Sequence, residues 1–281
     1  MSKVDLARWL LAGAGAAALS ACVTLPPNHQ RSPQDPWESW NRGVYRINNK
    51  LDRAVALPVT RAYVRHVPSP IRTGISNFFA NVDTPVVMIN DALQGKFKAA
   101  GNDLGRFLMN SVVGVGGLLD PASSAGLVRN YEDFGLTLGH WGAPPGPFLE
   151  LPILGPSDLR DGPSKLVDTY FKPITYIPND WVKYGLYLPY ALDTRASLLP
   201  LQSTIDQAFD PYALIRDAFL SRRAYLVSDG KVQPDQGLVD PDADAADQSP
   251  AAAGSSIAAP ATKPSPKPAQ PAPAPTTPPP Q

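Results

Sequence analysis

Side chains that could make or break covalent bonds are few in this chain, and they do not form a known catalytic pattern. The 281 residues include three histidines, His29, His66 and His140. No Gly-x-Ser-x-Gly sequence is present, so the serines lack the turn that exposes the nucleophile in many hydrolases. We therefore predict that the protein is not an enzyme, with an esterase or phospholipase as the catalytic alternative.

Patterns that hold metal ions are also absent from the sequence. There is no His-Glu-x-x-His segment, no cluster of cysteine and histidine, and no loop of the calcium-binding kind. The acidic residues between 235 and 247 resemble a solvated linker more than a metal loop. We therefore predict that the protein binds no metal and needs no other cofactor.

The single cysteine, Cys22, offers a different chemistry, which is the attachment of lipid. It follows two early basic residues, an apolar run and the small residues that precede a cleavage site. The segment Leu19-Ser20-Ala21-Cys22 resembles the lipobox of bacterial lipoproteins. That resemblance implies that residues 1–21 are a signal peptide and that acyl chains anchor the mature chain through Cys22. An ordinary secretory signal with a chance cysteine is the alternative.

The residue after the cysteine is Val23, and lipoproteins without Asp at that position are usually sorted to the outer membrane. Each acyl methylene that is buried contributes about 0.8 kcal/mol, so several chains together anchor a protein stably. The expected location is therefore the bacterial outer membrane, with a lipid-anchored domain that faces the periplasm.

Composition limits the remaining function classes. The chain has 25 basic and 25 acidic residues, so it lacks the excess positive charge of a general nucleic-acid binder. Its longest uncharged run that suits a helix, residues 107–119, is too short to span a bilayer. We expect no nucleic-acid partner and no membrane-spanning helix.

The chain divides into four parts by composition. After the signal peptide, residues 22–34 form a polar tether, and residues 35–231 are rich in large apolar side chains. Residues 232–281 are dominated by proline and alanine and contain no aromatic residue. Such a segment buries too little apolar surface to offset its ordering entropy, so we predict a disordered tail.

The globular part is predicted to be all-α, with ordered connections rich in proline and glycine. No run of five or more residues alternates cleanly between apolar and polar, as a strand would. Proline directly after a capping residue is typical of a helix start. Five such pairs occur, at Asp35-Pro36, Ser69-Pro70, Thr84-Pro85, Asp120-Pro121 and Asp210-Pro211.

The first predicted helix, residues 36–53, has an apolar arc and a separate basic arc. Trp37, Ile47 and Leu51 lie on the apolar arc when the helix is projected at 100° per residue. Such a helix either packs its apolar arc on a core, or lies in a lipid interface with its cations near phosphates. The lipid anchor just upstream favours the second interpretation.

Five stretches resemble those of a single family. They are DPWESWNRGVYRIN (35–48), SNFFANVDTPVVMINDALQGKF (76–97), GRFLMNSVVGVGGLLDPAS (105–123), EDFGLTLGHWGAPPGPFLELPILGPSDLRD (132–161) and DTRASLL (193–199). With these stretches, in this order, residues 35–228 resemble the MlaA/VacJ family of outer-membrane lipoproteins.

The resemblance implies a ring-like bundle of amphipathic helices embedded in one leaflet of the outer membrane. It also implies an amphipathic channel that removes misplaced phospholipids from the outer leaflet and passes them to a soluble periplasmic carrier. Members associate with trimeric outer-membrane porins. The alternative is a structural or adaptor lipoprotein that tethers a partner or the cell wall to the membrane, and the proline- and alanine-rich tail would suit it.

The resemblance also nominates site residues. The family's channel and hairpin segment corresponds to the region of Asn77 and Phe78, so the expected lipid path includes Asn77, Phe78 and Phe79. Glycines that are candidates for flexible wall elements are Gly114, Gly116 and Gly117. Basic residues that could contact lipid headgroups or a porin are Arg42, Arg46 and Arg53.

Overall fold

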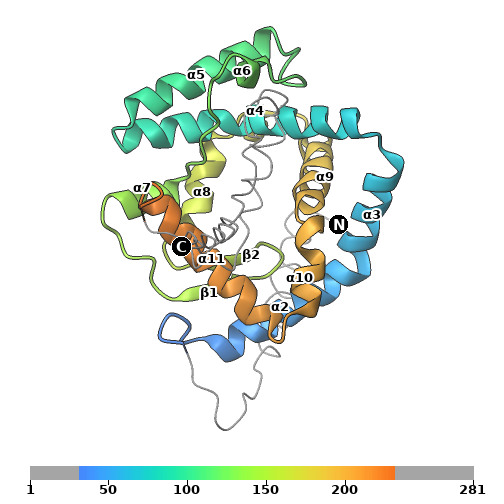
Figure 1. The fold of residues 1–281 in the computed structure, drawn as a ribbon, viewed down its shortest axis with the longest axis vertical. Helices are drawn as coiled ribbons and strands as arrows, with labels where there is room; N and C mark the ends of the chain where they lie inside the picture. Colours follow the sequence, from blue (N-terminus) through green and yellow to red (C-terminus); the bar gives the residue numbers. More distant parts are fainter. Residues whose placement is uncertain (1–31, 232–281) are drawn as a thin grey trace, which may run out of the picture.

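The computed structural model describes residues 32–231. The predicted signal peptide, the anchor residue Cys22 with most of the tether, and the predicted disordered tail lie outside these residues. Within them the fold is helical, as the sequence predicts. In Figure 1 the helices follow one another around a ring, with α4 across the upper part beneath α5, α3 and α9 on one side, and α2 and α11 below.

The first half of the ring is one long run of helix. A π-helical turn, η1 (Asp52–Ala56), joins the first two helices without a break and lets the chain bend. The α4–α5 hairpin that follows turns at Gly95, whose φ of 76° suits glycine. The four helices are α2 (Glu38–Leu51), α3 (Leu57–His66), α4 (Ser69–Leu93) and α5 (Phe97–Val112).

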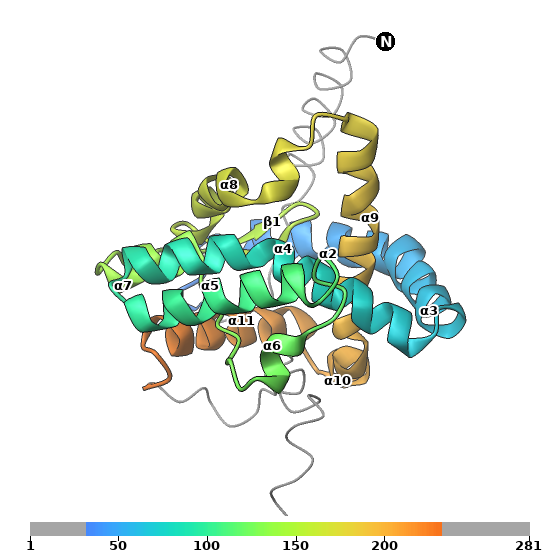
Figure 2. The ribbon, with the colours of Figure 1, turned by 90° about the horizontal axis from the view of Figure 1, so that it is seen from above.

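The second half consists of shorter pieces that close the ring. Its helices are α6 (Pro121–Ser124), α7 (Phe134–His140), α8 (Asp161–Phe171), α9 (Asp180–Ser197), α10 (Gln202–Gln207) and α11 (Pro211–Val227). Two 3-10 turns, η2 (Pro173–Tyr176) and η3 (Leu199–Leu201), precede and follow α9. Viewed at 90°, most helices lie in one slab, from which the first turns of α9 project (Figure 2).

Two of the five proline pairs cap helices as predicted. Asp120 caps α6 by accepting a hydrogen bond from the backbone N of Ser123 at 3.1 Å. Asp210 caps α11 in the same way, with the backbone N of Ala213 at 3.2 Å. In both cases proline follows at the first helical position, where its missing N–H costs nothing.

The other three pairs behave differently. Ser69 begins α4 but makes no capping bond. The prediction is wrong for Thr84, which lies inside α4, where its hydroxyl donates to the carbonyl of Ala80 at 2.9 Å. It is also wrong for Asp35, because α2 begins three residues later, at Glu38. Packing against α5 and α9 keeps α4 helical through its internal proline despite the lost backbone bond.

A short β-hairpin departs from the all-α class that the sequence analysis predicts. Strand β1 (Phe148–Leu151) pairs antiparallel with β2 (Gly155–Asp158), and Phe148 faces Asp158 in the register. Each strand has four residues, which is too few to show an alternating pattern. Left-handed residues, Ile153 at φ 66° and Gly155 at φ 75°, turn the chain between them.

Candidate functional site

Helix α5 shows the feature that distinguishes this molecule, which is an apolar outside and a polar inside. Phe97 is 74% exposed and Leu108 is 53% exposed, and both lie on the outer face. Asp103, Arg106 and Asn110 lie on the buried face. This is the reverse of a helix on a water-soluble domain, whose apolar stripe faces the core.

Helix α2 is inverted in the same way. Glu38 and Asn41 on this helix are fully buried, together with Val44, whereas Ile47 and Leu51 are exposed. The interpretation that the apolar arc packs on a core is therefore wrong for Ile47 and Leu51. An exposed apolar arc is what the lipid-interface alternative requires.

The inversion extends over the whole described part of the molecule. Among residues 32–231, nine hydrophobic and twenty polar or charged side chains are buried. Large hydrophobic side chains are exposed on helices α2 to α5, α8 and α9, and on the loops between them. Surface apolar area on this scale marks a site that contacts a membrane or other apolar partner, because water-soluble monomers rarely expose it.

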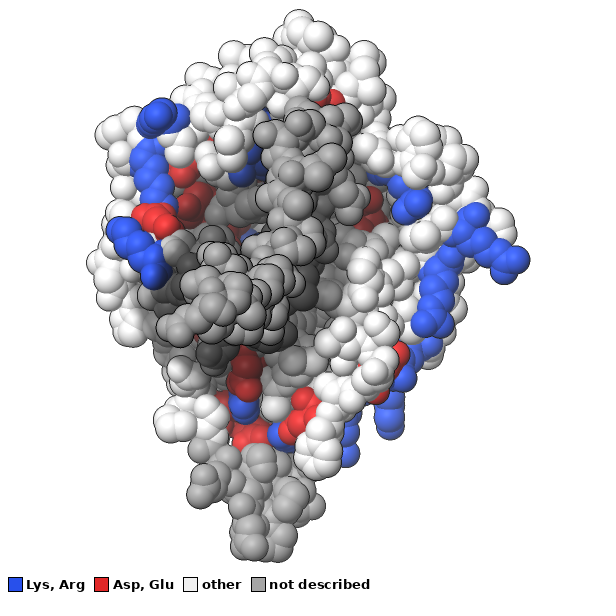
Figure 3. All heavy atoms as spheres, viewed as in Figure 1, with Lys and Arg blue, Asp and Glu red and all other residues white. Residues whose placement is uncertain are grey.

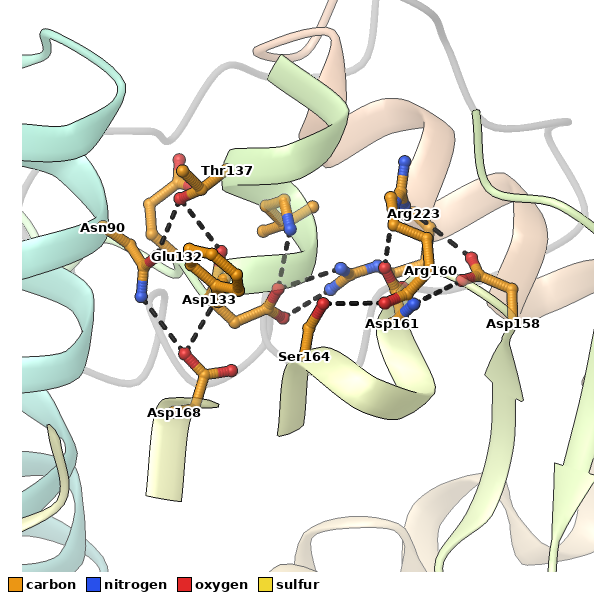
Figure 4. A network of polar contacts seen from close by, with 12 residues as sticks. Asn90, Glu132, Asp133, Thr137, Asp158, Arg160, Asp161, Ser164, Asp168 and Arg223 are labelled. Atoms are coloured by element: carbon orange, nitrogen blue, oxygen red, sulfur yellow. Dashed lines mark hydrogen bonds and ion pairs between the residues drawn. The ribbon is translucent and has the colours of Figure 1, made fainter. Parts of the chain in front are cut away.

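The buried polar groups hold one another in place, which allows a small apolar core to suffice. In Figure 4, Arg223 on α11 reaches across to the carboxylates of Asp133, which caps α7, and Asp161, which begins α8. Its guanidinium binds both oxygens of Asp133 at 2.5 and 2.9 Å and an oxygen of Asp161 at 2.5 Å. Arg160 adds a contact to Asp161 at 2.8 Å. The pKa of Asp133 stays low despite its burial, because Arg223 stabilises the carboxylate.

The same cluster continues to α4. Asn90 donates to Asp168 on α8 at 3.2 Å and accepts from the hydroxyl of Thr137 on α7 at 2.7 Å. Asp168 also accepts from the backbone N of Phe134 at 3.0 Å. Burial raises the pKa of Asp168 to about 6, and the nearby Asp133 carboxylate adds to the shift. The cluster thus fixes α4, α7, α8 and α11 relative to one another.

Two asparagines on α2 hold the hairpin. Asn41 donates to the carbonyl of Phe148 and accepts from the backbone N of Glu150, both at 3.0 Å. Asn48 donates to the carbonyl of Leu151 at 2.9 Å. The asparagines are seven residues apart, so they share one face of the helix. Sequence reasoning missed them, although two asparagines at that spacing beside the apolar arc are the signal that could have found them.

A further polar cluster joins α4 to α9. The carboxylate of Asp83 contacts the Lys172 ammonium at 3.0 Å and accepts from the Tyr190 hydroxyl at 2.9 Å. Burial and the Asp83 carboxylate raise the pKa of Tyr190 to about 12, so its phenol stays protonated. The cluster supplies a polar link between elements whose outer faces are apolar.

The projecting end of α9 exposes two aromatic side chains close together. Trp181 is 90% exposed, and Tyr184 and Leu188 follow it on the same helix with about two thirds of their surface exposed. Asn179 caps the helix by accepting from the backbone N of Trp181 at 2.9 Å. Aromatic side chains with one polar edge are typical of the boundary between lipid and water.

The predicted lipid-path residues on α4 do not share one environment. Asn77 donates to the carbonyl of Leu118 at 3.3 Å, and Phe78 is half-buried. Phe79 is buried and packs against Tyr190, with ring centroids 4.9 Å apart. Phe79 is thus one of the buried hydrophobic residues, and its place in the lipid path stays a prediction.

The predicted glycines lie in the turn after α5, beside Asn77. A Cβ on Gly114 would stand 2.4 Å from the carbonyl oxygen of Leu119, and one on Gly117 would stand 2.7 Å from Asn81. Gly116 is exposed, with a φ of 69°. Gly114 and Gly117 therefore allow close packing of the backbone, and the role of the three glycines as flexible wall elements stays a prediction.

The three predicted arginines also differ. Arg42 binds Glu38 at 2.8 Å and Asp210 at 2.5 Å, so its charge is already used within the molecule. Arg53 contacts Asp206 at 2.6 Å but remains half-exposed. Arg46 is exposed, and no ion pair or hydrogen bond engages it in the described part of the chain. Arg46 thus remains the strongest of the three candidates.

Two negative findings apply to the described residues. None of the helices in 32–231 has the length and hydropathy needed to cross a bilayer. In the same range, no group of histidine, cysteine and acidic side chains is arranged to hold a metal ion.

Comparison with known proteins gives concordant matches. The family model described as MlaA lipoprotein matches residues 33–226. The intermembrane phospholipid transport system lipoprotein MlaA of Escherichia coli K12 is 34% identical over 227 residues, covering 79% of this chain and 89% of that protein. The protein of the same name from Haemophilus influenzae is 35% identical over 225 residues, covering 77% and 89% respectively.

A solved structure agrees with the fold. It comes from work described as "Structural basis for maintenance of bacterial outer membrane lipid asymmetry" and superposes with a TM-score of 0.63 at 35% identity. The match covers 70% of this chain and all of the solved chain.

Proposed function

Because the chain belongs to the MlaA lipoprotein family, we propose that it removes misplaced phospholipids from the outer leaflet of the bacterial outer membrane. It passes them to a soluble periplasmic carrier and so maintains lipid asymmetry. The relatives from Escherichia coli and Haemophilus influenzae are named for phospholipid transport between membranes, and the similar solved structure for outer-membrane lipid asymmetry.

The observation that carries the proposal is the inverted distribution of polar and apolar side chains. A phospholipid does not cross a bilayer freely, because its charged headgroup must pass through hydrocarbon. A protein lowers that barrier when it offers a polar route beside apolar walls. Apolar outer faces such as that of α5, around an interior rich in polar groups, suit a body that lies within one leaflet.

The proposal includes an acyl anchor on Cys22, an outer-membrane location and association with a trimeric porin. It requires no covalent chemistry, since moving a lipid between leaflets breaks no bond. Directional transport needs an energy source elsewhere, which fits delivery of the lipid to a downstream carrier. Asn77 and Phe78, beside the turn at Gly116, remain the candidates for contact with the moving lipid.

An experiment in cells tests the transport function. Cells that lack the protein should show more outer-leaflet phospholipid, measured by chemical labelling of intact cells, and the wild-type chain should restore the low level. A Cys22→Ala copy should restore it only partly, because the anchor is lost. Unchanged outer-leaflet phospholipid in the deletion strain would refute the proposed function.

Phase partition separates this function from the adaptor alternative. An adaptor lipoprotein whose apolar groups are internal should enter the aqueous phase once Cys22 is replaced by alanine. The inverted surface predicts instead that the Cys22→Ala protein still enters the detergent-rich phase of a detergent solution. Recovery of that variant mainly in water would favour the adaptor.

A further inference from the structure

The outer edge of α2, η1 and α3 combines two rows of side chains. The first row is aliphatic, and each member is at least 43% exposed: Ile47, Leu51, Val55 and Val59. The second is basic, and its members are also exposed: Arg46, Lys50, Arg61 and Arg65. We call these eight residues the basic edge. In the space-filling view, Lys and Arg side chains follow one another down the side of the molecule where α3 and α2 lie (Figure 3).

The π-helical turn keeps the aliphatic row on one side. Its residues are four positions apart in the sequence. A regular α-helix has about 3.6 residues per turn, so residues spaced by four gradually move around the helix axis. A π-helical turn such as η1 contains more than four residues. Residues spaced by four there move around the axis in the opposite direction, which returns the row to the same side. Val55 within η1 and Val59 beyond it are therefore exposed like Ile47 and Leu51.

The charges of the basic edge are not neutralised within the described part of the protein. No ion pair engages Arg46, Lys50, Arg61 or Arg65 there. The two acidic residues of the same stretch are occupied elsewhere. Glu38 binds Arg42 at 2.8 Å, and Asp52 binds Arg195 at 2.7 Å.

We propose that the basic edge binds anionic phospholipid headgroups, of the phosphatidylglycerol class, in the leaflet that surrounds the protein. The proposal rests on the membrane location proposed above and adds a lipid class to it. Aliphatic side chains in one row enter the acyl region, while the neighbouring cations lie at the level of the phosphates. Arginine can bind a phosphate through two parallel hydrogen bonds.

The preference for an anionic lipid follows from charge balance. Phosphatidylcholine and phosphatidylethanolamine carry a cation of their own, which neutralises the phosphate and competes with the protein. Phosphatidylglycerol leaves its phosphate charge uncompensated. Four cations spread over about 28 Å of helix would therefore hold several such headgroups beside the ring.

Spin-labelled lipids measure this preference directly. The full mature chain is reconstituted in phosphatidylcholine bilayers, and electron paramagnetic resonance gives the share of labelled lipid that the protein immobilises. Labelled phosphatidylglycerol should associate about threefold or more better than labelled phosphatidylcholine. Changing Arg46, Lys50, Arg61 and Arg65 to Gln should bring the two lipids to equality.

Three further variants test whether the charge itself and its position matter. Changing Arg46, Arg61 and Arg65 to Lys keeps the charge and should keep most of the preference. The pair Arg61→Gln and Arg65→Gln should weaken it, whereas the pair Lys98→Gln and Lys231→Gln removes as much charge from exposed sites off this edge and should leave it intact. Equal loss in both pairs would overturn the proposal.

The outcomes separate failure of this inference from failure of the proposed function. If the protein immobilises phosphatidylcholine but shows no preference for phosphatidylglycerol, the inference fails while the membrane location stands. If it immobilises no lipid, the membrane location itself fails. If the wild type shows no preference and the four-residue variant loses co-purification with a porin, the edge is a protein contact and the inference is wrong.

Discussion

At the scale of single residues, Gly135 shows how closely the buried ionic cluster is packed. A Cβ at this position would stand 2.4 Å from the Asp161 carboxylate and 2.8 Å from the Arg223 guanidinium. Neither group can shift without losing a partner, because each is fixed by ion pairs. Glycine is therefore required here by space, whatever its backbone freedom.

We expect Gly135→Ala to lower the free energy of unfolding by about 1–3 kcal/mol, the usual cost of overpacking. Thermal unfolding in detergent micelles measures the change. Gly101→Ala is the matched control, because α5 leaves open space around Gly101 and alanine favours helix by about 1 kcal/mol. Equal destabilisation by both substitutions would contradict the packing argument.

Glu150 is a residue whose burial links stability to pH. Burial raises the pKa of Glu150 to about 7, although a hydrogen bond from Asn48 at 3.0 Å opposes the shift. The native state thus holds a proton that the unfolded chain releases near pH 4.5. The stabilising effect of that proton is complete below pH 4.5 and disappears as the pH rises to about 7.

As the pH rises from 4.5 to 7, we therefore expect the contribution of Glu150 to make the free energy of unfolding fall by up to about 1.4 kcal/mol per pH unit. Glu150→Gln should remove this contribution and flatten the profile over the same window. Chemical unfolding of both proteins at pH 5 and pH 7.5 provides the comparison. Identical slopes would show that Glu150 does not hold the proton.

At the scale of elements, one arginine links α11 to both α7 and α8. Arg223 is largely buried and binds Asp133 and Asp161, so its loss leaves Asp133 without its cation and Asp161 with Arg160 alone. By contrast, Arg53 pairs with Asp206 on a half-exposed surface, where solvent screens the interaction. The two ion pairs have similar distances but different environments.

We expect Arg223→Ala to cost about 3–5 kcal/mol of stability, as removal of one partner from a buried pair does. Arg53→Ala should cost at most about 1 kcal/mol. Thermal unfolding of the two variants under the same conditions tests the contrast. A similar effect of both would mean that burial does not govern the strength of these links.

Helix α4 places two neighbouring phenylalanines in different settings. Phe79 is buried against Tyr190, whereas Phe78 is half-buried. We expect Phe79→Ala to lower stability by about 3–5 kcal/mol.

Phe78→Ala should cost less stability than Phe79→Ala and should change the outer-leaflet phospholipid level in complemented cells. An unchanged lipid level with Phe78→Ala would remove that residue from the lipid path.

At the scale of the whole molecule, the exposed apolar surface should decide where the protein resides. Leu104 and Leu108 lie on the outer face of α5, away from the buried polar side. Changing both to Glu should move the Cys22→Ala protein from the detergent-rich phase toward water, because charged groups in lipid are costly. Changing both to Met keeps the face apolar and should have little effect. No difference between the two pairs would mean that α5 does not face lipid.

Some features could be predicted from the sequence because they depend on local chemistry. Proline after Asp120 or Asp210 starts a helix through capping bonds within one turn, and helical periodicity placed α2 within residues 36–53. The family was also visible in sequence, because its motifs are contiguous strings of residues. The hairpin was not, because its strands are too short to show a pattern and asparagines on α2 hold them in place.

Only the tertiary structure decided which side of each helix faces inward. Amphipathic periodicity specifies two faces but not the medium that each one meets, so an apolar face predicts a core as readily as a lipid contact. Arg42 and Arg46 look alike in sequence. Asp210, distant in the chain, comes within 2.5 Å of Arg42, while Arg46 is exposed without a described ion pair. Such contacts depend on closure of the ring, which brings together residues far apart in the chain, and no local pattern encodes them.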